Sequence, residues 1–186
     1  GCMLSAASCN KWWQDEIIGT TDYKGEEAKI TPEKLGKNHV FFLPYLMGER
    51  SPINDTNARA TFIGMTMDTT RADMTQAMLE GVAFAIRDSF EVAKSLGISI
   101  PRSNICGGGS KSALWKTITA NVLGIPLDTV ATEQGPGYGA AMLAMVACGR
   151  FASVREAADA LVRVKSTVEP DAELTKLYDE RYAQFR

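Results

Sequence analysis

The apolar positions of the chain repeat most clearly at helical spacing between residues 70 and 97. They recur there every three or four positions, as Leu79, Val82, Ile86, Phe90 and Ala93. Thr70 followed by Asp73 is a capping-box signal for a helix start, and Gly97 stands where a helix commonly ends. The pattern therefore predicts one long helix over this segment, with its apolar face turned toward a core.

The same spacing predicts further helices of lower regularity. One begins near residue 113 and ends at Gly124 and Pro126, with apolar positions at Leu114, Trp115, Ile118 and Val122. Weaker patterns predict helices at residues 3–18, 140–148, 171–184 and after Ser153. Residues 19–38 are polar and rich in Gly, Thr and Lys, so we expect an irregular connection there.

Short β-prone runs alternate with these helices. Strands are expected at residues 39–43, 61–65, 103–106 and 126–131, and turn-forming residues predict a loop at 47–59. From residue 39 onward the order is strand, strand, helix, strand, helix, strand, helix. That order indicates an α/β fold rather than a helical bundle or a sandwich.

A glycine-rich turn between a predicted strand and a predicted helix is the main candidate for chemistry. Residues 107–112 read G-G-G-S-K-S, so the backbone can approach a ligand closely, and the following helix N-terminus offers N–H donors. This geometry suits a phosphate, a ribose or a purine face, and the alternative is a tight turn that binds no ligand. The order of Ser110 and Lys111 excludes a Walker A loop, and Ser112 stands where a dinucleotide fingerprint requires its third glycine.

A second glycine-rich segment precedes the Ala-rich helix predicted at 140–148. Gly135, Gly137 and Ala140 satisfy the loose dinucleotide pattern G-x-G-x-x-A, but no strand carrying an acidic residue follows about 20 residues later. A nicotinamide-dependent oxidoreductase would depend on this segment alone. We favour the interpretation that its small residues let the helix pack tightly on the sheet, and this interpretation is compatible with a loop that borders a ligand cleft.

Composition and charge exclude several classes of protein. The 186 residues fit one domain, and 45% hydrophobic with 23% charged residues is ordinary globular usage. The net charge of −2 and the lack of a basic stripe argue against a nucleic-acid partner, and no apolar run approaches the ~20 residues of a membrane span. Four scattered cysteines without a C-x-x-C pair, and a single histidine, argue against a zinc site and fit a reducing, cytoplasmic location.

Several motifs together resemble the C-terminal part of the FGGY carbohydrate kinases, most closely the members that act on D-xylulose. The matching segments follow the family's order along essentially the whole chain and lie at residues 3–9, 42–52, 60–80, 79–82, 107–112 and 135–141. The resemblance implies an actin-like ATPase fold of the sugar kinase and hexokinase class. In that class two lobes enclose the sugar and ATP, and this α/β chain would be the nucleotide-binding lobe.

The resemblance also implies an adenosine site, which it assigns to seven residues: Ala7, Lys11, Gly107, Gly108, Gly109, Ser110 and Ser112. Gly108 occupies the position of the family's nucleotide-contacting glycine. Ser112 takes the place where relatives often have an asparagine, which leaves a hydroxyl beside the adenosine. Ala7 and Lys11 fall where relatives line the adenine pocket. ATP or ADP is the expected cofactor, with Mg²⁺ held mainly by the phosphates and by the other lobe.

The family's D-x-G-T loop, second phosphate loop and G-G-x-D-N segment with the catalytic aspartate do not occur in residues 1–186. We therefore expect a fragment that lacks the first strands of its domain and the N-terminal sugar-binding lobe, contains no catalytic residue and is inactive alone. The expected activity of the complete enzyme is phosphorylation of D-xylulose to D-xylulose 5-phosphate. The alternatives are a kinase for gluconate, ribulose or glycerol, or a non-catalytic nucleotide-binding module.

The expected partners are therefore ATP or ADP and, mainly through the other lobe, a sugar. No nucleic acid and no membrane is expected. A homodimer is a further hypothesis, because apolar stretches at residues 40–46 and 140–146 would be exposed in an isolated lobe.

Overall fold

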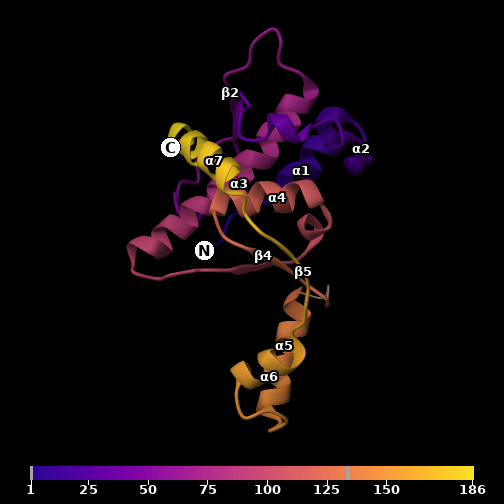
Figure 1. Cartoon of the computed structure of the whole chain (residues 1–186), viewed down its shortest axis with the longest axis vertical. Coiled ribbons are helices and arrows are strands. Elements are labelled where there is room, and N and C mark those ends of the chain that lie inside the picture. The colour runs from indigo at the N-terminus through magenta and orange to yellow at the C-terminus, as the bar shows by residue number, and fades with distance from the viewer. Residues whose placement is uncertain (1, 133–134) are drawn as a thin grey trace.

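The computed structural model describes residues 2–132 and 135–186 (Figure 1). Its α-helices, in chain order, are α1 (Ser8–Trp12), α2 (Tyr23–Glu27), α3 (Arg71–Ser95), α4 (Ala113–Leu123), α5 (Gly135–Ala147), α6 (Val154–Leu161) and α7 (Ala172–Phe185). Its strands are β1 (Phe41–Leu43), β2 (Thr61–Ile63), β3 (Ser103–Ile105), β4 (Leu127–Val130) and β5 (Val164–Val168). Within the described part of the chain, no helix has both the length and the apolar character to cross a membrane.

Helix α3 is the centre of the molecule, and the sequence predicts both of its ends. The Thr70 side chain accepts from the backbone N–H of Asp73, and the Asp73 carboxylate accepts from the backbone N–H of Thr70, which completes the capping box. The helix ends before Gly97, which adopts a left-handed φ of 77°. Helix α3 packs against β1, α4 and α7, and its Met78 and Phe84 side chains are fully buried in the core.

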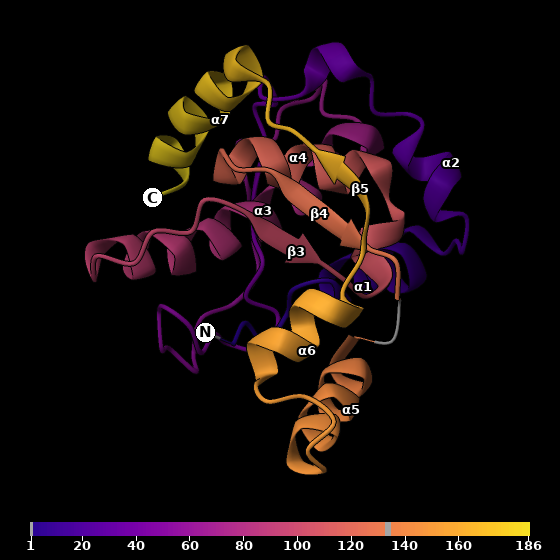
Figure 2. The ribbon, with the colours of Figure 1, turned by 60° about the horizontal axis from the view of Figure 1, so that its bottom comes forward.

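The five strands form two separate sheets. Strands β1 and β2 make an antiparallel pair in which Phe42 lies opposite Phe62. Strands β3 and β4 are parallel and joined through α4, as the α/β prediction requires, and β5 adds to β4 antiparallel. Figure 2 shows β3, β4 and β5 side by side, with α4 behind them.

Strand β5 was not among the predicted elements. Four of its five residues are exposed, so its side chains do not alternate between a core and solvent. Its pairing with β4 is made by the backbone, which leaves no trace in the hydrophobic pattern.

The first 40 residues differ from expectation in two places. Residues 3–7 are not helical, and the helical segment that begins at α1 continues as a π-helix over Trp13–Ile18. The expected irregular connection at 19–38 contains α2 and a 3₁₀ turn at Pro32–Lys34. The Asp22 side chain caps α2, and the buried Glu26 of α2 pairs with Arg71 of α3 at 2.8 Å. Contact with α3 therefore supports a helix of only five residues, which propensity alone does not predict.

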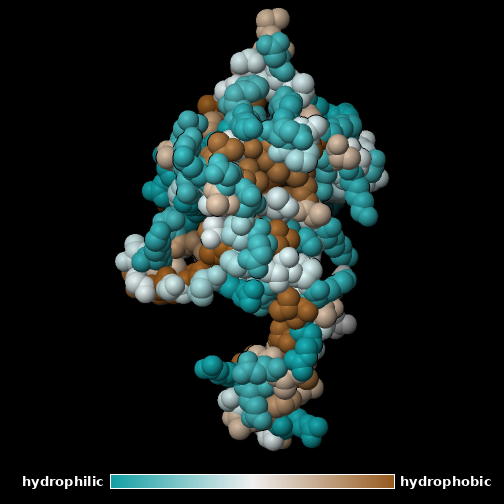
Figure 3. Space-filling view, in the orientation of Figure 1, coloured by the Kyte–Doolittle hydropathy of each residue, from teal (hydrophilic) through white to brown (hydrophobic). Residues whose placement is uncertain are grey.

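Helix α5 also differs from what the sequence predicts. It begins at Gly135, so the predicted glycine turn forms its first turns, and none of its described residues is buried. It packs on α6 and extends away from β3–β5 instead of lying tightly on the sheet (Figure 1). Hydrophobic atoms are visible at the surface where this pair joins the rest of the molecule (Figure 3), and Leu143 and Val164 are among the exposed apolar side chains.

The two apolar stretches behind the homodimer hypothesis have opposite environments. Val40, Phe42 and Tyr45 are buried, so residues 40–46 belong to the core and the expectation of exposure is wrong there. In residues 140–146, Leu143 and Met145 are exposed. Self-association through α5 stays a prediction, which sedimentation velocity over a range of concentrations would test.

Candidate functional site

A cavity of about 810 Å³ lies between α1, α2, α3 and the glycine loop that precedes α4. This volume is in the range of small-molecule sites, roughly 300–1,000 Å³. Helix α3 contributes apolar side chains, α1 and α2 contribute most of the polar ones, and the loop contributes backbone. The lining residues are Ala6, Ala7, Asn10, Lys11, Tyr23, Lys24, Glu27, Ala28, Ile30, Met78, Leu79, Val82, Gly108, Gly109, Lys111, Ser112, Ala113, Leu114 and Trp115.

The three consecutive glycines of the loop differ in whether the structure requires a glycine at each position. Gly107 has a φ of 79°, a conformation that L side chains rarely adopt. A Cβ on Gly109 would lie 1.8 Å from Cζ3 of Trp115, so the ring itself requires a glycine there. A Cβ on Gly108 would meet no atom within 4 Å, and the φ of Gly108 lies outside the positive range that disfavours other residues. A Cβ on Gly107 would also meet no atom within 4 Å, but Gly107 does not line the large cavity, so Gly108 is the one of the three that offers open space there.

Ser112 connects the loop, α4 and α2. Its Oγ accepts a hydrogen bond from the backbone N–H of Trp115 at 2.9 Å, which caps α4. The same Oγ donates to Oε2 of Glu27 at 2.7 Å. The hydroxyl has a single proton, so its donor is already in use.

Ser110 and Gly107 lie on the other side of the loop. The Ser110 hydroxyl donates to the carbonyl of Gly107 at 2.7 Å and so closes its own turn. Both residues line a separate cavity of about 260 Å³, together with Lys116 and Lys165. Two of the seven residues assigned by resemblance are thus outside the large cavity.

Ala7 and Lys11 do line the large cavity, as the resemblance implies for an adenine pocket. Ala7 directly precedes α1, and Lys11 lies one turn further along. The Lys11 ammonium pairs with Asp15, and its side chain is 73% exposed, so it stands at the rim. Ala7, Lys11, Gly108, Gly109 and Ser112 therefore surround one space although they come from opposite parts of the chain.

Sequence reasoning missed the contribution of α2 to this cavity. Glu27 is half-buried, and burial raises the pKa of its carboxyl group while the hydrogen bond from Ser112 lowers it in part. Asn10 and Trp115 also line the cavity, and Asn10 Oδ1 and Trp115 Nε1 are buried without a partner among the described residues. No motif identifies Glu27, because α2 was not expected to be a helix at all, and the helical patterns around Asn10 and Trp115 do not show that these two side chains meet at one cavity.

The cavity has the volume and the mixed apolar and polar lining of a small-molecule site, and these can be compared with what a nucleoside would need. A purine needs an apolar surface for its ring faces, which the side chains of Met78, Leu79 and Val82 offer. The open space at Gly108 lets the backbone approach a ligand. The unpartnered polar atoms beside the cavity leave hydrogen-bonding capacity unused. No cluster of three His, Cys, Asp or Glu side chains suited to a metal ion occurs in the described ranges.

Comparison with known proteins identifies the family. The sequence model of the FGGY family of carbohydrate kinases, C-terminal domain, matches residues 5–148. The chain is 33% identical to a xylulose kinase of Staphylococcus xylosus over 182 residues, which is 98% of this chain and 38% of that protein. It is 34% identical to a xylulose kinase of Escherichia coli over 185 residues, which is 99% of this chain and 38% of that protein.

The fold agrees with the sequence match. The structure of a xylulose kinase from Brucella ovis has a TM-score of 0.88 at 35% identity, covering 100% of this chain and 38% of that one. This likeness confirms the expected lobe of the sugar kinase class with its actin-like ATPase fold. The chain thus spans 38% of the length of each of these relatives. Both comparisons support one conclusion: the chain belongs to the FGGY family of carbohydrate kinases and has the fold of that family's C-terminal domain.

Proposed function

We propose that this chain is the adenosine-binding part of an ATP-dependent carbohydrate kinase, with D-xylulose as the sugar. The observation that carries the nucleotide assignment is the cavity of about 810 Å³ bordered by Gly108. It joins apolar side chains, open space at a backbone turn and a helix N-terminus in one place, which is what a nucleoside with phosphates needs.

The choice of D-xylulose depends on the relatives. The two relatives described above are xylulose kinases at 33% and 34% identity. The chain spans only 38% of their length, so the sugar contacts of the whole protein are themselves a proposal. Gluconate, ribulose and glycerol are the alternative substrates within the family. The four cysteines of the described chain are all unpaired, which supports a reducing location such as the cytoplasm.

The proposed role of this chain in catalysis is positioning. The glycine loop and the α1, α2 and α3 side chains hold the nucleoside, so that the γ-phosphate is presented to a sugar hydroxyl bound by the rest of the enzyme. Mg²⁺, carried on the phosphates, would offset their charge. Residues 1–186 by themselves are then expected to bind nucleotide without transferring phosphate.

Isothermal titration of the chain with ADP, and with NAD as the control ligand, tests the nucleotide assignment. Gly108→Val should weaken ADP binding about tenfold or more, because the new side chain enters the open space beside the cavity. Gly139→Val is the matched control: its Cβ also meets nothing within 4 Å, but it lies on α5, away from the cavity. Equal ADP affinity in both variants, or saturation with NAD and not with ADP, would contradict the proposal.

A further inference from the structure

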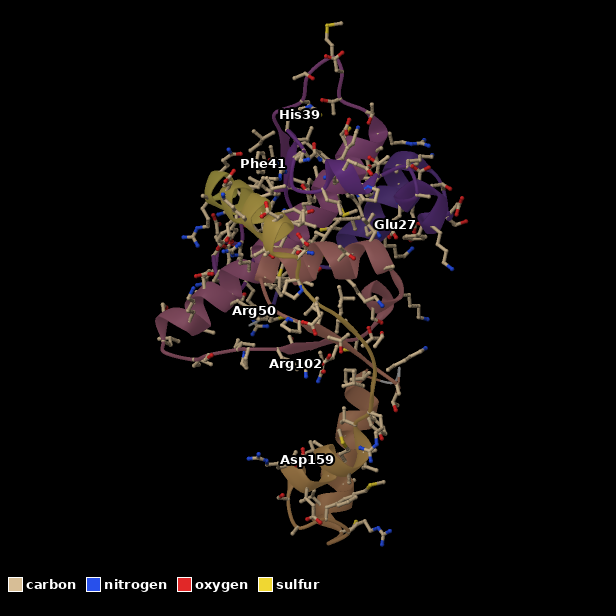
Figure 4. All side chains as sticks on the ribbon, in the orientation of Figure 1. Glu27, His39, Phe41, Arg50, Arg102 and Asp159 are labelled. Atoms are coloured by element: carbon tan, nitrogen blue, oxygen red, sulfur yellow. The ribbon has the colours of Figure 1, made fainter. Side chains whose placement is uncertain are left out.

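Among the described residues that line the large cavity, Glu27 is the only one with a carboxylate. Glu27 is the last residue of α2, which lies beside α1 in Figure 1, and Figure 4 labels its side chain. Its Oε2 accepts the hydrogen bond from Ser112, whereas its Oε1 accepts none from any described residue. One oxygen is thus held in place and the other is available to a ligand in the cavity.

Three cations of the described chain line the cavity together with this carboxylate: Lys24 of α2, Lys11 of α1 and Lys111 of the glycine loop. Lys11 pairs with Asp15, and all three lysines are exposed to solvent. Burial raises the pKa of Glu27, which reports a carboxyl group partly withdrawn from water. A partly dehydrated acceptor is stabilised by a hydrogen-bond donor on the ligand.

The chemistry of a nucleotide limits what this donor is. Phosphate oxygens are acceptors and repel a carboxylate, so they do not face Glu27. The donors on the nucleoside are the exocyclic amino group of the base and the hydroxyls of the ribose. The Ser112 hydroxyl does not donate to an acceptor on the base, because it donates its only proton to Glu27.

We infer that Glu27 determines nucleoside specificity in this site, its Oε1 accepting a hydrogen bond from a base amino group or a ribose hydroxyl. The inference depends on the proposed function, since it assigns a role within the same nucleotide site. Ser112 is then a positioning residue: it caps α4 with one lone pair and orients the Glu27 carboxylate with its proton.

The test compares Glu27→Gln with the unchanged chain by titration with ADP. Glutamine keeps the shape of the side chain and an oxygen for Ser112, but it removes the charge and presents an N–H₂ donor to the ligand. We expect ADP affinity to fall about tenfold or more, the usual weight of a hydrogen bond to a charged group. Glu33→Gln is the control, because Glu33 is an exposed carboxylate outside the cavity.

Three analogues of ADP identify the donor. The diphosphate of purine riboside lacks the base amino group, and 2′-deoxy-ADP or 3′-deoxy-ADP lacks one ribose hydroxyl. The analogue that lacks the donor should bind the unchanged chain more weakly than ADP does, and this difference should disappear in Glu27→Gln. The melting temperature of each variant, measured by circular dichroism, checks that the fold is intact.

The outcomes separate this inference from the proposed function. If the unchanged chain does not bind ADP, the proposed nucleotide site is wrong and the role of Glu27 is wrong with it. If the unchanged chain binds ADP and Glu27→Gln binds it equally well, only the role of Glu27 is overturned. The role of Glu27 is also overturned if each analogue binds more weakly than ADP by the same factor in the unchanged chain and in Glu27→Gln.

Discussion

The ion pair between Arg181 and Glu80 attaches the C-terminal helix α7 to the central helix α3. The Arg181 guanidinium lies 2.9 Å from Oε2 of Glu80, and the two side chains are 7% and 1% exposed. The guanidinium also donates to the carbonyl of Val40 and lies over the ring of Phe41. Helix α3 contributes three apolar side chains to the lining of the cavity, so this ion pair also holds part of the candidate site in place.

The change to make is Arg181→Met, which keeps most of the side-chain volume and removes the charge. Glu80 would keep its hydrogen bonds from Gln76 at 2.7 Å and Tyr178 at 3.0 Å, but its buried negative charge would lose its counter-ion. Removing one partner of a buried pair costs about 3–5 kcal/mol. That is a large part of the roughly 5–15 kcal/mol by which domains are stable. The double variant Arg181→Met/Glu80→Met should recover part of the loss, because no buried charge remains.

The dependence on pH gives this prediction a second readout. Burial raises the pKa of Glu80 above its ordinary value of 4.5, and Arg181 opposes that rise. Without Arg181 the rise is larger, so the folded variant holds a proton on Glu80 more tightly than the unfolded chain does. Its free energy of unfolding is then highest below pH 4.5 and falls as pH increases through the raised pKa of the folded state.

Urea denaturation followed by circular dichroism at pH 5 and pH 8 measures both effects. We expect Arg181→Met to lose more stability at pH 8 than at pH 5, relative to the unchanged chain. A loss below about 1 kcal/mol would refute the reasoning, because it would place the pair among solvent-screened surface bridges. An equal loss at both pH values would show that the buried charge of Glu80 is not the cause.

Two further predictions concern the start of α3 and the glycine loop. Burial raises the pKa of Asp73, but hydrogen bonds from Thr70 and Lys34 outweigh it and lower the pKa from 3.8 to about 2. The stabilisation is therefore present above about pH 4 and is lost as pH falls toward 2. Asp73→Asn should lower the free energy of unfolding by about 1 kcal/mol at pH 7 and weaken the dependence of the melting temperature on pH in the acid range. An unchanged dependence of the melting temperature on pH would contradict this prediction. Gly109→Ala should cost about 1–3 kcal/mol and alter tryptophan fluorescence, because its Cβ overlaps the ring of Trp115. Gly108→Ala should cost much less, because its Cβ would meet no atom within 4 Å. Equal melting temperatures of Gly108→Ala and Gly109→Ala would show that the Trp115 ring moves aside freely.

The segments with strong periodicity and clear caps were predicted well. The ends of α3 follow from Thr70, Asp73 and Gly97, and all three act as their sequence positions predict. The β3–α4–β4 unit was predicted from a strand-like run, a glycine turn and a helical repeat, and it is confirmed. These elements are specified by interactions among residues near in sequence, which is why a pattern reveals them.

The elements that were missed depend on distant partners. Helix α2 has five residues and is supported by the contact of Glu26 with Arg71, 45 positions away. Strand β5 is supported by backbone pairing with β4. The π-helix at Trp13–Ile18 and the outward course of α5 likewise lack a local sequence signal.

For the candidate site, the sequence by itself determined the glycine loop between a strand and a helix, and the family to which the chain belongs. Resemblance singled out Gly108 as the nucleotide-contacting glycine, but the sequence did not show a structural reason for each of the three glycines. Only the tertiary structure decided that Gly109 accommodates the ring of Trp115 while Gly108 borders open space. It also brought Glu27 within 2.7 Å of Ser112, across 85 positions of sequence. The physical reason is that a turn is specified by local backbone conformation, whereas a cavity exists only between elements that packing has brought together.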